Sequence, residues 1–400
     1  MRRSTAGPPA SPATIPLPTV INSKRKVIST SCATHERACR RGRNPHAIRD
    51  DGGTLPIHYR AVTVRHASFR RSPVRAHPGV AAVTAAVCGA LLLAPARPAR
   101  AEDPPPSGKP LANFPATVAL SMTDPERSPA GANDWSCRPT PRHPEPVVLV
   151  HGTWANAYNS WSYMAPALRR AGYCVFALNY GAPRGRVFKA TGDIRRSAAE
   201  LGRFVDRVRT ATGARKVALV GHSQGGMMPR WYLRYGGGAN PADPSRNKVS
   251  QLISLGASHH GTSLNGIGNQ FQMLGLERPT GAALGTAARQ QLAGSPFLVE
   301  LNKGGDTVPG VHYTAIASRY DEVVNPFRLA FLSAGPGATV DNILLQDGCP
   351  ADLADHLDLM YDPRVLHHVE RALAARGPLP RGSRDAVCRP FLPVAGVPLH

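Results

Sequence analysis

The chain has 400 residues, 42% of them hydrophobic, and a formal net charge of +22. This apolar content supports one large core. Residues 1–101 contribute +14 of the charge through 17 basic and 3 acidic residues, which leaves +8 for the rest. Because we expect this first segment to be removed, the charge does not indicate a nucleic-acid-binding protein.

The N-terminal segment has the features of an export signal. Residues 1–69 are rich in Pro, Ser and Arg, and we expect a disordered or spurious extension there. Within 70–101, arginines precede the apolar stretch 80–94, and Ala99-Arg100-Ala101 follows it, as in a signal peptide. Fifteen apolar residues are too few to span a bilayer comfortably, although an uncleaved anchor is the alternative. We therefore expect a secreted protein, without a stable membrane span in its mature form, that begins with a linker over 102–130.

Four cysteines follow the expected cleavage point: Cys137, Cys174, Cys349 and Cys388. An even number in an exported domain indicates two disulfides, and three pairings are possible, with free buried thiols as the alternative. Cys137 and Cys174 precede and begin neighbouring core strands, so we expect them to pair and to leave Cys349 for Cys388. Each bond would close a loop of about 38 residues, worth roughly 4 kcal/mol.

Residues 131–400 alternate short apolar runs with amphipathic stretches. Strands are expected at 146–150, 173–178, 217–220, 249–255, 311–318 and 338–346. Helices are expected at 160–171, 193–212, 224–235 and 363–375. Buried strands separated by helices predict a single α/β domain with a mostly parallel sheet and helices on both faces. Such folds place their sites at the carboxyl ends of the strands.

One segment, 264–310, interrupts this alternation. It places nearly fifty residues between two strands, and 287–301 within it has helical apolar spacing. We expect either a lid or cap above the carboxyl edge of the sheet, or a packed structural excursion.

The candidate nucleophile is Ser223 in Gly221-His222-Ser223-Gln224-Gly225. A buried strand leads into this motif and a helix follows it, as in the nucleophile elbow of an α/β-hydrolase. Side chains at the two flanking positions would clash in so tight a turn, so both are glycine. The serine hydroxyl would stand at the sheet edge, and the N–H of Gln224 would face the developing oxyanion.

A second oxyanion donor is expected directly after the first core strand, in His151-Gly152-Thr153. Glycine lets this loop approach the nucleophile, and we select the N–H of Thr153 as the donor. His151 is expected to hold the loop and not to act as a base.

The acid and base are selected by chain order, which in this fold is Ser, Asp, His. Asp321 lies where the fifth strand ends, and His356 lies in the loop after the sixth. Asp341 and Asp347 flank the sixth strand, whereas the acid is expected one strand earlier than the histidine, so we set both aside. We also set aside two histidines within an apparent helix, His367 and His368.

No motif in the sequence indicates a cofactor. The adjacent His259 and His260 would point in different directions, so they do not make a metal site by themselves. The chain has no Gly-rich phosphate loop, C-x-x-C pair or acidic metal cluster, and we expect neither cofactor nor metal. Apolar residues expected near the site suit an acyl chain: Trp154, Trp161, Met227, Met228 and Leu274.

Together these motifs resemble the actinomycete secreted triacylglycerol lipases of the class 2 lipase family. The matching stretches lie in the family's order and span roughly 130–375: 133–137, 146–161, 172–181, 220–228, 318–324 and 349–363. The resemblance implies acyl glycerol ester hydrolysis through an acyl-enzyme. It implies Ser223, Asp321 and His356 as triad, Thr153 and Gln224 as oxyanion hole, and the pairing of cysteines given above. The departure is 264–310, which is much longer than in lidless bacterial lipases.

We therefore expect a monomeric lipase or esterase that acts on acyl esters, with lipid–water interfaces as one setting. An acyltransferase or a polyester hydrolase with the same triad is the alternative. A binding module without catalysis is disfavoured, because all five required groups are present.

Overall fold

A computed structural model describes residues 111, 114–273, 281–380 and 388–391. The extension and signal peptide expected over 1–101 lie outside these residues, as does Leu274. No helix among the described residues is long and apolar enough to cross a membrane.

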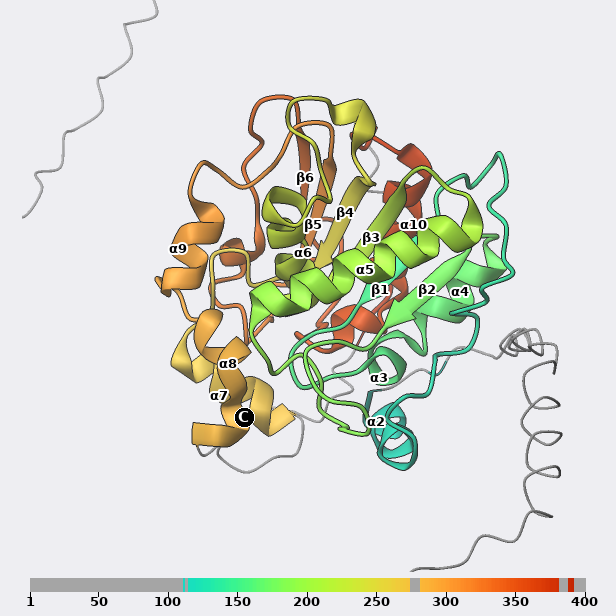
Figure 1. The fold of residues 1–400 in the computed structure, drawn as a ribbon. Helices are drawn as coiled ribbons and strands as arrows, with labels where there is room; N and C mark the ends of the chain where they lie inside the picture. Colours follow the sequence, from blue (N-terminus) through green and yellow to red (C-terminus); the bar gives the residue numbers. More distant parts are fainter. Residues whose placement is uncertain (1–110, 112–113, 274–280, 381–387, 392–400) are drawn as a thin grey trace, which may run out of the picture. The chain divides into compact units, whose positions relative to one another are not determined.

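The core is a six-stranded sheet in the order β2-β1-β3-β4-β5-β6, and every neighbouring pair is parallel (Figure 1). Its strands are β1 (Val147–Val150), β2 (Val175–Leu178), β3 (Val217–His222), β4 (Val249–Leu255), β5 (His312–Ala317) and β6 (Thr339–Leu344). All six expected strands are confirmed. In register, Val150 of β1 lies beside Gly221 of β3, so the loops after these two strands emerge at the same edge.

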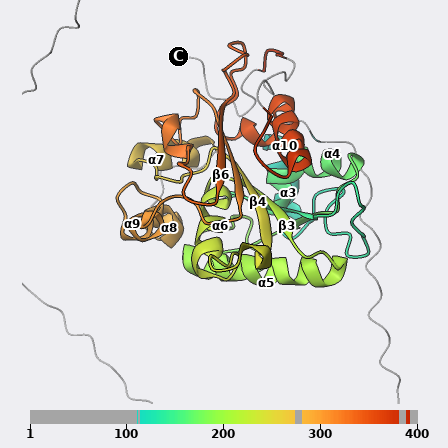
Figure 2. The same ribbon diagram turned by 90° about the horizontal axis from the view of Figure 1, so that it is seen from above.

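Helices cover both faces of the sheet (Figures 1 and 2). One face carries α5 (Ile194–Thr212) and α6 (Gln224–Tyr235). The other carries α3 (Ala157–Trp161), α4 (Met164–Arg170) and α10 (Pro363–Ala375). Short 3₁₀ helices occur at Pro244–Arg246, Phe327–Ala330 and Asp358–Met360. This arrangement is the α/β architecture that the sequence predicts.

The single helix expected over 160–171 is divided into α3 and α4. Pro166 has no N–H to donate to the carbonyl of Ser162, four residues earlier, and the N–H of Leu111 donates to that carbonyl instead. Asn156 forms a capping box with Asn159, which starts α3 before the expected boundary.

The expected linker over 102–130 contains a helix, α2 (Phe114–Thr123). Its buried residues are Phe114, Thr117 and Ser121. Phe114 packs edge-on against Tyr361, with ring centroids 6.3 Å apart, and the Thr117 hydroxyl lies 2.8 Å from the Tyr361 hydroxyl. This segment is therefore packed against the domain. The sequence pattern does not reveal the buried face of α2, because two of its three buried residues are polar.

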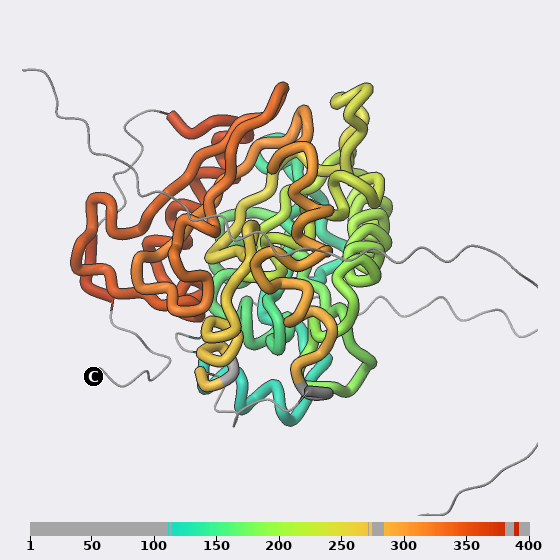
Figure 3. The backbone as a smooth tube through the Cα atoms, turned by 90° about the vertical axis from the view of Figure 1, so that its left-hand side faces the viewer, coloured from blue at the N-terminus to red at the C-terminus, as the bar shows by residue number. Residues whose placement is uncertain are grey.

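The insertion, residues 264–310, contains α7 (Leu264–Met273), α8 (Gly281–Gln290) and α9 (Pro296–Asn302). Figure 3 shows these yellow and orange segments gathered together. The stretch expected as one helix over 287–301 is two, because α8 ends at Gln290 and Ser295 caps α9 at Pro296. A bridge between Thr262 and Leu292 ties the segment just before the insertion to the insertion's second half.

The described residues form two disulfides, Cys137–Cys174 and Cys349–Cys388, and this is the expected pairing. The first joins the segment before β1 to the segment that leads into β2. The second joins the loop after β6 to the C-terminal segment, and so holds the stretch that carries His356 at both ends.

Candidate active site

Ser223 lies in the turn between β3 and α6, with φ 53° and ψ −124°. A positive φ at a non-glycine residue is strained and persists only where the surroundings impose it. They do so here through two glycines. A Cβ on Gly221 would lie 1.9 Å from the carbonyl oxygen of Gly225, and one on Gly225 would lie 2.1 Å from that of Val150. The elbow geometry thus requires glycine at both flanking positions.

The loop after β1 packs directly against this elbow. A Cβ on Gly152 would lie only 3.0 Å from the Cβ of Ser223, so the loop approaches the nucleophile as closely as expected. The backbone N–H groups of Thr153 and Gln224 donate no hydrogen bond to any described residue. Both donors are therefore available to an oxygen held at Ser223.

Buried contacts fix the shape of the 151–155 loop. Its backbone exchanges two hydrogen bonds with Lys189, Trp154 N–H to Lys189 O at 2.9 Å and Lys189 N–H to Ala155 O at 3.1 Å. The His151 ring stacks on Tyr180 at 4.4 Å between centroids, and its Nδ1 lies 2.8 Å from Gly152 O. Burial lowers the pKa of His151 to about 4, so this ring is neutral. His151 therefore lies where it can hold the 151–155 loop in place, as the sequence predicts.

Asp321 follows β5, and His356 lies in the loop after β6. The structure brings them together, with His356 Nδ1 2.9 Å from Asp321 Oδ2. The other carboxyl oxygen, Oδ1, accepts the N–H groups of Val323 at 2.9 Å and Val324 at 2.7 Å. Asp321 is 2% exposed and His356 is 0% exposed. This contact orients the ring so that Nδ1–H donates to the carboxylate and Nε2 is the free acceptor.

His356 Nε2 is buried and has no hydrogen-bond partner among the described residues. No hydrogen bond links it to Ser223, a common state in a hydrolase without substrate, where this contact tightens on binding. Burial lowers the pKa of His356, but the charge of Asp321, its hydrogen bond, and the charges of Glu322 and Asp355 raise it more. The net pKa is above the usual 6.5, so the site stabilises an imidazolium.

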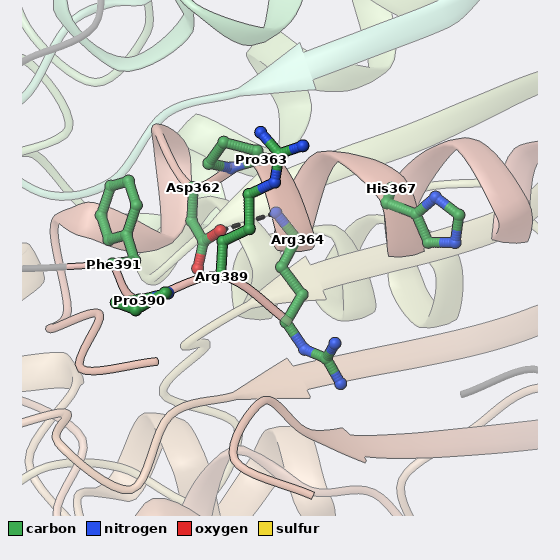
Figure 4. A pocket seen from close by; sticks show the side chains of 7 residues that line it. All are labelled: Asp362, Pro363, Arg364, His367, Arg389, Pro390 and Phe391. Carbon is green, nitrogen blue, oxygen red and sulfur yellow. Dashed lines mark hydrogen bonds between the residues drawn. The ribbon is translucent and has the colours of Figure 1, made fainter. Parts of the chain in front are cut away.

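The rejected candidates lie elsewhere. Asp341 is on β6, where its Oδ2 accepts the N–H of Leu379 at 2.9 Å, and Asp347 is exposed. His367 and His368 are in α10, as expected. His367 helps to line a pocket of ≈ 330 Å³ at the start of that helix, and this pocket contains none of the five expected site residues (Figure 4).

The side chains of His259 and His260 point in different directions, as the sequence predicts. His259 Nε2 lies 3.0 Å from Ser254 Oγ in the core, and His260 Nε2 lies 3.5 Å from Asp306 Oδ2. In the described part of the chain, no group of three or more His, Cys, Asp or Glu side chains is placed to hold a metal ion.

The expected acyl-chain contacts need correction. Trp161, Met227 and Met228 are 0% exposed and belong to the two main core clusters, because they lie on helix faces turned toward the sheet. Trp154 alone among the described residues of that set faces the insertion, where it packs with Ile267 and Ala288. Ser223 is 1% exposed, so the site is covered in this structure.

Two residues beside the expected triad have no role assigned to them from the sequence. His222 donates to the backbone of His356, with its Nε2 2.8 Å from the carbonyl oxygen. Glu322 is largely buried, and neither of its carboxyl oxygens has a hydrogen-bond partner on another described residue. Burial and the charge of Asp355 raise its pKa to about 7. The only sequence signal for either residue is its position next to Ser223 or Asp321, two of the expected triad residues.

Comparisons with known proteins find lipases similar to this chain. Residues 144–334 match the family model for Lipase (class 2). Triacylglycerol lipases of Pseudarthrobacter phenanthrenivorans and Burkholderia plantarii are each 30% identical over 122 residues, which is 29% of this chain and 34% and 30% of theirs. The chain thus matches about a third of the length of these curated relatives.

The fold is also similar to a solved structure. Aspergillus fumigatus lipase B superimposes with a TM-score of 0.51 at 22% identity, over 76% of this chain and 68% of that one. This likeness supports the α/β-hydrolase fold. Residues 144–334, just under half of the chain, are thus similar to the class 2 lipase family.

Proposed function

We propose that this protein is a secreted, monomeric serine hydrolase that cleaves carboxylic esters, acyl glycerols in particular, through an acyl-enzyme. The observation that carries the proposal is the 2.9 Å contact between His356 Nδ1 and Asp321 Oδ2, beside a serine held at positive φ. The curated relatives are triacylglycerol lipases, which supports the substrate class. The two disulfides support export to an oxidising compartment.

In this mechanism Ser223 Oγ attacks the ester carbonyl while His356 Nε2 takes its proton. Asp321 stabilises the resulting imidazolium. The carbonyl oxygen becomes an oxyanion that accepts the N–H groups of Thr153 and Gln224. Collapse of the tetrahedral intermediate expels the alcohol, which receives the proton from His356. Water then attacks the acyl-enzyme by the same steps and releases the fatty acid.

The insertion serves as a cap in this proposal. Its helices α7 and α8 supply Ile267 and Ala288, which pack with Trp154 over the loop beside Ser223. Because Ser223 is 1% exposed, substrate entry requires the cap to be displaced, as a lipid–water interface could do.

The covered site also favours a second candidate, acyl transfer to an alcohol, since exclusion of water spares the acyl-enzyme for another acceptor. Polyester cleavage would use the same groups. The product ratio with and without added alcohol separates transfer from hydrolysis: a transferase forms mainly the new ester, and a lipase mainly the free acid.

The central test is hydrolysis of p-nitrophenyl esters of increasing chain length by the purified protein and its Ser223→Ala variant. We expect turnover that is lost in the variant, and stoichiometric labelling of Ser223 by a fluorophosphonate. Equal rates in the two proteins would end the enzyme proposal. An N-terminus at residue 102 in the culture medium, and a monomeric mass there, would support secretion and the monomeric state.

A further inference from the structure

Lys189, whose backbone holds the 151–155 loop, also has a buried side chain. The residue is 1% exposed, and a lysine is rarely buried to this extent unless its charge is paired. Its Nζ lies 2.5 Å from Glu126 Oε1 and 3.0 Å from the carbonyl oxygen of Pro183. Glu126 follows α2, in the region expected from the sequence to be a linker. An ion pair therefore joins the N-terminal segment to the loop after β2.

The carboxylate of Glu126 accepts two further hydrogen bonds from that loop. Its Oε1 accepts the N–H of Gly185 at 2.9 Å, and its Oε2 accepts Nδ2 of Asn179 at 3.3 Å. Burial raises the pKa of Glu126, but these hydrogen bonds, together with the hydrogen bond and charge of Lys189, lower it more, so the net pKa is below the usual 4.5. The glutamate is therefore ionised at neutral pH and compensates the buried charge of Lys189.

The backbone of Lys189 connects this ion pair to the loop beside the nucleophile. Its carbonyl oxygen accepts the N–H of Trp154 at 2.9 Å, and its N–H donates to Ala155 O at 3.1 Å. Trp154 has a φ of 57°, a conformation that persists at a non-glycine residue only where the surroundings impose it. The paired hydrogen bonds with Lys189 supply that constraint. Because Trp154 directly follows Thr153, they also limit how the backbone around the Thr153 N–H can turn.

We propose that the ion pair between Glu126 and Lys189 positions the oxyanion hole. The two are positioning residues: they hold the 151–155 loop so that the N–H of Thr153 faces an oxygen bound at Ser223, and neither touches the substrate. The inference rests on the proposed function and deepens it. It gives the segment that precedes β1 a part in turnover.

The first test is Glu126→Gln, which keeps the size of the side chain and removes its charge. The amide offers one acceptor oxygen to three donors, and it leaves the Lys189 ammonium buried without a counter-charge. Complete loss of one oxyanion donor costs roughly 10²–10³ in kcat, so a displaced donor should cost at least about tenfold. We expect that loss with p-nitrophenyl butyrate as substrate, with KM little changed.

A boronic acid gives a readout that a purely structural role would not move. It forms a tetrahedral adduct with Ser223 that places an oxygen in the oxyanion hole, so its affinity reports on the hole directly. We expect the inhibition constant of butylboronic acid to rise in Glu126→Gln by about the same factor as kcat/KM falls.

The second variant, Lys189→Met, removes the ammonium group but keeps an unbranched side chain and the backbone hydrogen bonds of this position. It leaves no buried cation, so it tests the ion pair even where Glu126→Gln does not fold. We again expect kcat to fall with KM little changed. In the double variant, the loss of kcat should be smaller than the product of the two single losses, because both changes break the same pair.

Asp134→Asn is the matched control. Asp134 is another acidic residue of the N-terminal segment, and its Oδ2 lies 3.0 Å from Arg169 Nη2 in α4 instead of contacting the loop after β2. Its replacement should lower the thermal midpoint of unfolding, as Glu126→Gln does, and leave both kcat and the inhibition constant intact.

The outcomes separate this inference from the proposed function. A kcat within about threefold of the original in folded Glu126→Gln or Lys189→Met overturns the positioning role while Ser223→Ala remains inactive. So does an inhibition constant that stays constant while kcat/KM falls, or a double variant whose losses simply multiply. An original protein without esterase activity or fluorophosphonate labelling overturns the proposed function itself.

Discussion

The Nε2 atom of His222 lies 2.8 Å from the backbone carbonyl oxygen of His356, and the two rings are 4.7 Å apart between centroids. Burial and the nearby His356 lower the pKa of His222 well below its usual value, so this ring stays neutral and donates from one nitrogen only. The residue next to the nucleophile therefore holds the loop that carries the proposed base.

His222→Phe tests this contact, because it preserves a ring in the core but removes the donor. A hydrogen bond of this kind contributes about 1 kcal/mol, so we expect kcat to fall roughly fivefold to tenfold with little change in KM. His367→Phe, at a partly exposed site in α10, should leave the kinetics unchanged. An unaltered kcat in His222→Phe would show that the loop keeps its position without this bond.

Asp321→Asn should be far more damaging. The amide preserves the shape but no longer stabilises the imidazolium or enforces the Nδ1–H tautomer, and the equivalent change in a serine protease costs about 10⁴ in kcat. Asp347→Asn changes an exposed aspartate in the same part of the chain and should have no effect. Steady-state ester hydrolysis measures both, and a small loss in Asp321→Asn would remove it from the triad.

The activity should depend on the protonation of His356. Only the neutral ring can accept the serine proton, and its pKa lies above 6.5, so kcat/KM should rise with pH through a midpoint above that value. Glu322 contributes to this raised pKa through its charge. In Glu322→Gln the midpoint should therefore move to lower pH. An unmoved midpoint would show that Glu322 does not interact with the base.

Glu322 should also affect stability. Its folded-state pKa is about 7, above the usual 4.5 of a glutamate, so between these pH values the folded protein retains a proton that the unfolded chain has released. The free energy of unfolding should thus decrease as pH rises from about 4.5 to about 7 and then level off. Glu322→Gln removes this loss, which amounts to at most about 3.5 kcal/mol at about 1.4 kcal/mol per pKa unit. Denaturant unfolding at pH 5 and pH 8 measures it, and an equal change at both pH values would contradict the prediction.

Gly225→Ala should prevent formation of the elbow, because the new Cβ would lie 2.1 Å from the carbonyl oxygen of Val150. We expect destabilisation of more than about 4 kcal/mol or no folded protein. Gly268→Ala, in α7, places its Cβ in open space and should be neutral or slightly stabilising. Thermal unfolding of the two variants side by side checks this difference.

The sequence predicts the centre of the sheet well because strands such as β1, Val147–Val150, are short apolar runs, and burial on both faces leaves that pattern directly in the chain. It predicts Asp321 and His356 because chain order and strand ends are enough to place them. It does not predict α2, whose buried face includes Thr117 and Ser121. Nor does it show the hydrogen bond that the Gln291 amide donates to the Thr153 hydroxyl, since a contact across 138 positions leaves no local pattern.

For enzyme engineering, the hydrogen bond between Gln291 and Thr153 limits how freely the 264–310 segment can be exchanged. A graft from a relative could bring a new substrate preference and still reduce turnover, because the glutamine travels with the replaced segment while the threonine stays behind. Libraries that vary this segment should therefore keep position 291 fixed, or vary it together with position 153.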